Sequence, residues 1–191
     1  MRARTVWASI GVGLALVVTA VAVATAPDSD GIIAVFPVRG SIGDVLEARA
    51  LTVQATNIRL AQRLEVGYTD VGATTTDGVW VVLDATITPR LGTTTISTST
   101  ITIDGVQYQA SDILPRSVNF LEYGAGVPQH GALLFELPES ALSAPGASAA
   151  EISINYYLAV LDTIPVVVVD LTALEVEPRA VITAPYVPDL E

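Results

Sequence analysis

An uncharged apolar run near the N-terminus constrains this chain more than any other feature of its sequence. Residues 6–26 contain no charged residue and no proline. A helix rises about 1.5 Å per residue, so a helix over this run is long enough to cross a bilayer core of roughly 30 Å. The sequence therefore predicts one N-terminal transmembrane helix at residues 6–26.

A cleaved signal peptide is the alternative for this run. The short basic segment at residues 1–5 is compatible with both a signal peptide and a retained anchor. The run is longer than the roughly 7–15 apolar residues of a usual signal-peptide core. Pro27 directly follows the small-residue pattern that ends at Ala26 and should hinder cleavage there, which leaves a site after Ala24 as the alternative. We expect the run to be retained as a signal-anchor.

The charges on either side of the run predict its orientation. Arg2 and Arg4 precede it, whereas Asp28 and Asp30 follow it. Positively charged residues that flank a membrane helix stay in the cytoplasm, so residues 1–5 should be cytoplasmic and the rest of the chain extracytoplasmic. The expected location is the cell membrane, which the chain crosses once.

Composition excludes several classes of partner and site. The chain has nine arginines, no lysine, and twenty Asp plus Glu, for a net charge of −11. Without the two cytoplasmic arginines, seven arginines face twenty acids, a balance of −13. Nucleic-acid binding needs a basic face, so we expect no such partner, and an anionic membrane would also repel the exported part as a whole. Cysteine is absent, which excludes disulfides and a lipid-modified cysteine.

Three segments follow the membrane run. Residues 27–31, PDSDG, are a polar linker. Residues 32–174 are rich in Val, Ile and Thr, whose branched side chains favour strands, and are long enough for one domain with a core. Residues 175–191 combine prolines with acids, and we expect them to form an extended or disordered tail.

The clearest strand pattern lies at residues 79–88, VWVVLDATIT, where Val79, Val81 and Leu83 share one face. Seven or eight such short strands with almost no helix predict an all-β fold, an antiparallel β-sandwich. Its continuous interior is expected to contain Val81, Leu83, Phe135, Ile154 and Val167.

Other segments are less uniform. Asp104 and Gly105 predict a two-residue hairpin turn between strands. Residues 57–66 fit either a short helix or a continued strand. Residues 67–78 and 111–131 are rich in Gly, Thr, Asp or Pro and are predicted as loops.

Four short motifs occur in this order along the chain: IGD at 42–44, GVWVVLD at 78–84, IDGVQY at 103–108 and GALLFELP at 131–138. Together they resemble the bacterial immunoglobulin-like domains of unknown function found on lipoproteins and single-span membrane proteins of Gram-positive bacteria. These domains are fold relatives of the mycobacterial immunoprotective extracellular antigen. The resemblance covers roughly residues 40–160 and implies an Ig-like β-sandwich outside the cell. It implies no activity, because the family has none in common.

No residue pattern in the sequence predicts catalysis. His130 is the only histidine and there is no cysteine, so a zinc or copper site is not expected. Glycoside hydrolysis needs only two carboxylates, and the candidates are Asp70, Asp77, Asp84, Glu136 and Glu139. All five occur where turns and strand edges normally carry acids. We therefore expect no enzyme, no cofactor, no metal and no small-molecule substrate.

The loop at residues 111–131 is the predicted partner contact. Phe120, Leu121, Tyr123 and Val127 place apolar groups in a connection rich in Gly and Pro. The alternative is that these side chains fold back and cap one end of the sandwich. The sequence thus predicts a non-enzymatic, membrane-anchored extracytoplasmic binding or adaptor module. Two other classes stay open: an accessory subunit of a membrane transport or envelope-assembly complex, and a carboxylate-dependent cell-wall glycan hydrolase.

Overall fold

The computed structural model describes Thr19 and residues 35–68, 72–96, 98–113, 117–119, 122–156 and 162–188. The chain divides into two units, Met1–Ala34 and Val35–Glu191, and every strand described below belongs to the second. Thr19 excepted, the predicted membrane run at 6–26 and the linker at 27–31 lie outside the described residues. Within the described ranges, no helix has the length and apolar content needed to cross a membrane.

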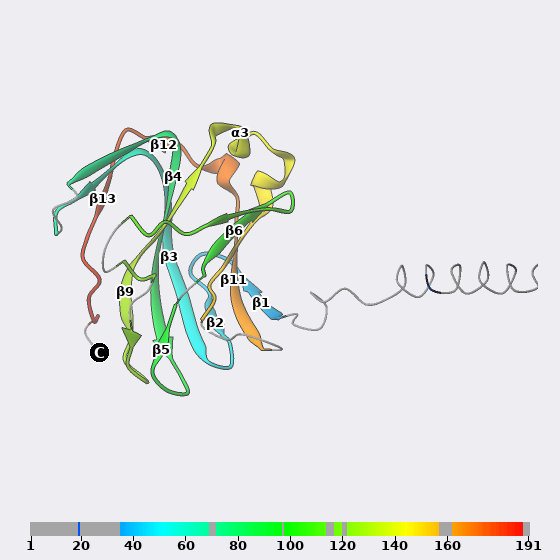
Figure 1. Cartoon of the computed structure of the whole chain (residues 1–191), viewed down its shortest axis with the longest axis vertical. Helices are drawn as coiled ribbons and strands as arrows, with labels where there is room; N and C mark the ends of the chain where they lie inside the picture. The colour runs from blue at the N-terminus through cyan, green and yellow to red at the C-terminus, as the bar shows by residue number, and fades with distance from the viewer. Residues whose placement is uncertain are drawn as a thin grey trace, which may run out of the picture. The chain divides into compact units, whose positions relative to one another are not determined.

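Two β-sheets form a sandwich (Figure 1). In spatial order, the first sheet contains β1 (Phe36–Gly40), β11 (Thr163–Val169), β10 (Ala150–Ser153), β6 (Thr100–Ile103) and β7 (Val106–Gln109). The second contains β12 (Val176–Glu177), β3 (Leu51–Val66), β4 (Ala73–Pro89) and β9 (Gln129–Leu137), with β2 (Val45–Glu47) and β13 (Ala180–Ile182) also paired to β3. The strands β5 (Thr94–Thr95) and β8 (Glu122–Tyr123) form a separate pair. Short helical turns are α3 (Glu139–Leu142), η1 (Pro145–Ala149) and η2 (Leu171–Ala173).

The predicted β-sandwich is confirmed, but its strands are not all antiparallel. β1 runs parallel to β11, and β12 and β13 run parallel to β3. In each case the paired strands are far apart in sequence, so the intervening chain can serve as the long crossover that parallel strands require. Pro37 lies in β1, which is an edge strand. The N–H group of an edge residue can face solvent, so a proline is tolerated there.

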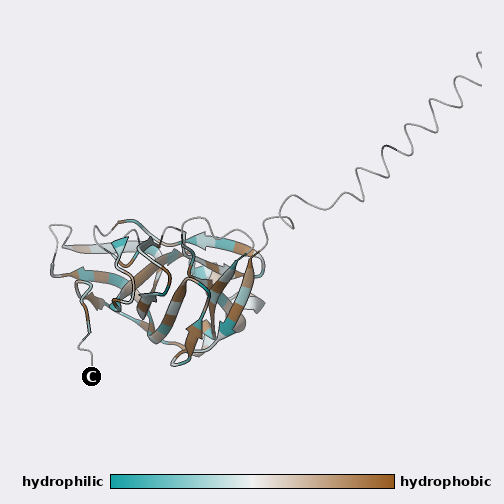
Figure 2. Cartoon of the chain, turned by 90° about the horizontal axis from the view of Figure 1, so that it is seen from below, coloured by the Kyte–Doolittle hydropathy of each residue, from teal (hydrophilic) through white to brown (hydrophobic). Residues whose placement is uncertain are grey.

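The core lies between the two sheets. The five residues predicted to share it, Val81, Leu83, Phe135, Ile154 and Val167, are completely buried and belong to one apolar cluster. Apolar and polar residues alternate along several strands in Figure 2, as expected when one face of a strand packs and the other meets solvent. The alternation in the sequence therefore identified the inward face of β4 correctly.

One long hairpin, β3–β4, differs from the sequence prediction. β3 continues through residues 57–66 as a strand, with register shifts after Ala55 and Ala61. The predicted loop at 67–78 is wrong for residues 73–78, because β4 already begins at Ala73. Thr-rich segments form strands as readily as loops, and pairing with β3 makes this segment a strand. The predicted turn at Asp104–Gly105 is confirmed: both residues have positive φ, 49° and 78°.

The C-terminal segment is extended and belongs to the fold. After β13, Tyr186 exchanges backbone hydrogen bonds with His130 of β9, at 2.8 and 3.0 Å. The segment contributes to a second apolar cluster, distinct from the core between the sheets: Ala61, Leu64, Val66, Trp80, Val82, Ala132, Leu134, Ala180 and Ile182. Residues 175–188 therefore help to bury side chains that project from β3, β4 and β9 away from the main core.

Candidate functional site

The four side chains predicted to contact a partner do not form one exposed patch. Phe120 and Leu121 lie outside the described residues. Tyr123 is completely buried, and its hydroxyl donates a hydrogen bond to the carbonyl oxygen of Val118 at 2.6 Å. Burial also raises the pKa of Tyr123 well above its ordinary value. Tyr123 thus has the capping position that was the alternative for this loop, whereas Val127 is 40% exposed.

Val127 lies in a turn that is hydrogen-bonded to the turn between β4 and β5. The N–H group of Gly126 donates to the carbonyl oxygen of Pro89 at 2.8 Å. Gly126 has a φ of 72°, a conformation that a residue with a β-carbon adopts only at a cost. Two positions after Pro89 lies Leu91, whose side chain is 65% exposed. A backbone hydrogen bond therefore holds the two turns together, and each turn has one exposed apolar side chain.

The turn between β2 and β3 joins the same end of the sandwich, which is the lower end in Figure 1. The N–H group of Arg90 donates to the carbonyl oxygen of Ala50 at 2.8 Å. The Arg90 side chain reaches the Ala48 carbonyl oxygen at 3.1 Å and forms an ion pair with Glu47 at 3.5 Å. These bonds fix the β4–β5 turn against the β2–β3 turn.

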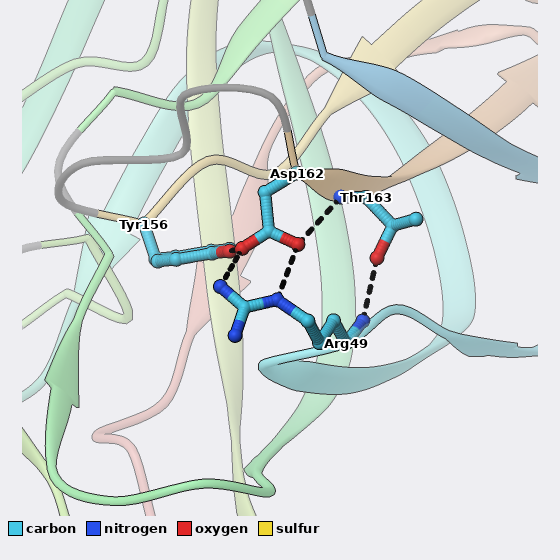
Figure 3. A network of polar contacts seen from close by, with 4 residues as sticks. All are labelled: Arg49, Tyr156, Asp162 and Thr163. Atoms are coloured by element: carbon cyan, nitrogen blue, oxygen red, sulfur yellow. Dashed lines mark hydrogen bonds and ion pairs between the residues drawn. The ribbon is translucent and has the colours of Figure 1, made fainter.

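A polar cluster then connects the β2–β3 turn to the first sheet (Figure 3). The Arg49 side chain donates from Nε to Oδ1 of Asp162 at 2.7 Å, and from Nη2 to Oδ2. The Tyr156 hydroxyl also donates to Oδ2 of Asp162, and the Thr163 N–H group donates to Oδ1 at 2.8 Å. The Arg49 N–H group donates to the Thr163 hydroxyl at 2.6 Å. We call the four residues Arg49, Tyr156, Asp162 and Thr163 the clasp.

The electrostatics of the clasp follow from its geometry. Hydrogen bonding from Arg49 is the main cause that holds the pKa of Asp162 far below its ordinary value. Hydrogen bonds from Tyr156 and Thr163 act in the same direction, whereas burial opposes them. Burial raises the pKa of Tyr156 to about 12, and its hydrogen bond to Asp162 adds to that shift. At neutral pH the clasp therefore contains a buried carboxylate, a guanidinium and a neutral phenol, and it acts as a structural connection.

The clasp also holds the start of β1. The N–H group of Phe36 donates to the carbonyl oxygen of Asp162 at 2.7 Å, and the Phe36 side chain is 59% exposed. We call Phe36, Arg49, Arg90, Leu91 and Val127 the turn surface. Its members come from four segments that are far apart in sequence and are linked by the hydrogen bonds given above.

Sequence reasoning found only Val127 of this surface. Leu91 carried a usable signal, because it lies between Pro89 and Gly92 and is an apolar residue in a turn, the same criterion that singled out Val127. Arg49 and Phe36 carried no such signal, since only the pairing of distant strands brings them to this end.

The described candidate carboxylates for hydrolysis are distributed over β4, β9 and α3. Asp77 and Asp84 are seven residues apart on β4, which corresponds to roughly 23 Å along a regular strand. The two carboxylates of a glycosidase are only about 5–10 Å apart. Asp84 forms an ion pair with Arg59 at 3.0 Å, and Glu136 accepts a hydrogen bond from the Thr76 hydroxyl at 2.5 Å. Asp70 lies outside the described residues.

His130 has two neighbours in β4 and the C-terminal segment. Its Nδ1 atom lies 3.0 Å from the Thr86 hydroxyl, and its ring centroid lies 5.2 Å from that of Tyr186. In the part of the chain that the structure describes, no three His, Asp or Glu side chains are grouped as a metal site requires.

Comparison with known proteins gives similar solved structures of low sequence identity. No protein-family model matches the chain, and no curated protein matches it. An uncharacterized β-sandwich protein from Clostridium difficile 630 is similar, with 11% identity and a TM-score of 0.45 over 70% of this chain and 94% of that chain. MPT63, a secreted protein from Mycobacterium tuberculosis, is similar with 17% identity and a TM-score of 0.46 over 69% of this chain and 98% of that chain. The β-sandwich that the family resemblance implies is present in this chain.

Proposed function

We propose that this chain is a non-enzymatic, membrane-anchored extracytoplasmic binding module that makes its contacts through the turn surface. The observation that carries the proposal is the exposure of apolar side chains on turns that are otherwise fixed by backbone hydrogen bonds. Leu91 and Phe36 are both more than half exposed, yet the backbone beside each is bonded to a neighbouring segment. Rigid loops at the end of a sandwich are a common place for contacts, because the strands fix the loops in position.

The polar residues support a binding role over a catalytic one. The most strongly perturbed carboxylate, Asp162, is buried and already accepts hydrogen bonds from three groups of the clasp. A carboxylate in that state is a poor general base, because its proton affinity is low and its lone pairs are occupied. Asp162 therefore serves to hold the sandwich end together.

The membrane-anchored location rests on the sequence. Residues 6–26 form the proposed signal-anchor, with residues 1–5 in the cytoplasm and the sandwich outside. Mass spectrometry of the mature protein should find the N-terminal segment still attached. A mature N-terminus at Thr25 or Pro27 would make the protein secreted and would overturn the anchor.

A photoreactive residue tests the contact surface itself. We would place it at Val127 in the full chain in native membranes, with the same residue at Val106 as the control. Val106 is 53% exposed and lies in the β6–β7 hairpin, outside the turn surface. A crosslink that forms from position 127 and not from 106 is expected. Equal crosslinking from both positions, or none from either, would contradict a binding role for the turn surface.

An accessory subunit of a membrane transport or envelope-assembly complex is the second candidate. Ala8, Gly11, Gly13 and Ala15 would give the proposed membrane helix a small-residue face of the kind that packs against other helices. In that case crosslinks from the helix, as well as from position 127, should reach one specific membrane protein.

A further inference from the structure

We propose that the turn surface binds the lipid bilayer itself. The end of the sandwich at which β1 begins would then rest on the extracytoplasmic surface of the cell membrane. This inference rests on the proposed signal-anchor and names the bilayer as the partner of the proposed binding module. Three features of the described residues support it: the point where the chain enters the domain, the side chains exposed there, and the charges beside them.

The chain enters the sandwich at the turn surface. β1 begins at Phe36, which the clasp holds through the 2.7 Å hydrogen bond to Asp162. The nine positions from 27 to 35 span at most about 30 Å when fully extended. With residues 6–26 in the membrane, a connection this short keeps the start of β1 within about 30 Å of the bilayer surface.

The exposed side chains at this end are those that a bilayer interface accepts. Phe36, Leu91 and Val127 are apolar and exposed, and they belong to three segments that the hydrogen bonds given above link at one end of the sandwich. An isolated exposed apolar residue needs no explanation, but several exposed apolar residues at one end of a domain are a feature of membrane and protein contact sites. Both arginines of the turn surface have partly exposed side chains, 63% for Arg49 and 44% for Arg90.

Local charge does not oppose this contact, although the domain as a whole is acidic. Arg49 is paired with Asp162 and Arg90 with Glu47, so these four groups contribute no net charge. The Arg49 nitrogen that does not bond Asp162 points away from the carboxylate (Figure 3) and can reach a lipid phosphate. Glu122 is exposed on the adjacent strand β8, so a zwitterionic bilayer is the appropriate probe.

The absence of cysteine makes the experiment direct. Single-cysteine variants of the full chain, Leu91→Cys and Val127→Cys, can each carry one environment-sensitive fluorophore. Val106→Cys is the matched control, because Val106 is also an exposed valine in a turn region but lies at the other end of the sandwich. The labelled chains are reconstituted into vesicles of phosphatidylcholine alone, with and without lipids that carry a nitroxide on the acyl chain.

We expect the label at positions 91 and 127 to emit at shorter wavelength than the label at 106. Nitroxide lipids should quench it at least about twofold more, since side chains at an interface lie within ~5–10 Å of the headgroup boundary. Equal emission and equal quenching at all three positions, in chains that float with the vesicles, would overturn this inference and leave the anchor standing. A chain that does not float with the vesicles would overturn the anchor and this inference with it. Shielding of position 91 in native membranes but not in lipid vesicles would assign the turn surface to a membrane protein instead.

Discussion

Replacing Ile182 with alanine tests whether the C-terminal strands stabilise the sandwich. Ile182 is 3% exposed on β13 and packs in the second apolar cluster, which also contains Trp80. Truncating a buried isoleucine to alanine costs about 2–5 kcal/mol. β13 is a three-residue strand near the chain end and can relax around the cavity, so the lower part of that range applies, about 2–3 kcal/mol. For a domain of this size the Tm should fall by roughly 4–12 °C.

The assay is urea unfolding of residues 35–191, which form one compact unit. Trp80 is then the only tryptophan, and it is buried in the cluster that Ile182 completes, so its fluorescence reports the local packing directly. Val181→Ala is the control: Val181 is the preceding residue of β13 but is 55% exposed, and its truncation should cost about 0.5 kcal/mol or less. If Ile182→Ala costs no more than Val181→Ala, the C-terminal strands contribute nothing to stability and the assignment of residues 175–188 to the fold is refuted.

Three further predictions concern the core and the clasp. Leu83→Ala should destabilise the same fragment by about 2–5 kcal/mol in urea unfolding, and a loss below about 0.5 kcal/mol would contradict complete burial of Leu83. The pKa of Asp162 is lowered in the folded state, so its contribution to stability is present above about pH 4 and is lost as the pH falls further. Stability measured between about pH 5 and 2 should therefore decline less steeply in Asp162→Asn than in the unmodified domain, and parallel declines would contradict the role of this carboxylate. Tyr156→Phe removes one hydrogen-bond donor to Asp162, so the pKa of Asp162 measured by NMR titration should rise, whereas an unchanged pKa would contradict the contact.

The clasp illustrates what strand patterns leave out. Arg49 and Asp162 are 113 positions apart in the chain, and neither lies in a motif that predicts a contact. Asp162 can bind Arg49 because β11 runs beside β1. This pairing brings the loop before β11 next to the β2–β3 turn. A parallel pairing between the first and one of the last strands of the sandwich is a property of the whole fold and has no local signal.

The proposed binding surface shows the same division. The sequence singled out four apolar residues in one loop, because apolar groups in a chain rich in Gly and Pro suggested contact. The two of these residues that the structure describes differ: Tyr123 is buried and its hydroxyl donates a hydrogen bond, whereas Val127 is exposed. Both residues meet the same sequence criterion. Only the pairing of β8 with β5 turns one of them into the core.

The sequence by itself determined the fold class and the inward faces of the strands. Val81, Leu83 and Phe135 are buried as predicted, because side chains alternate along a strand whatever its partner is. The turn at Asp104–Gly105 is also local, since it depends on the positive φ that these residue types accept. Tertiary structure decided the strand order, the incorporation of the C-terminal strands and the composition of the turn surface. Each of these depends on hydrogen bonds between segments that are distant in the chain. Such bonds stabilise the protein only after the whole sandwich has formed.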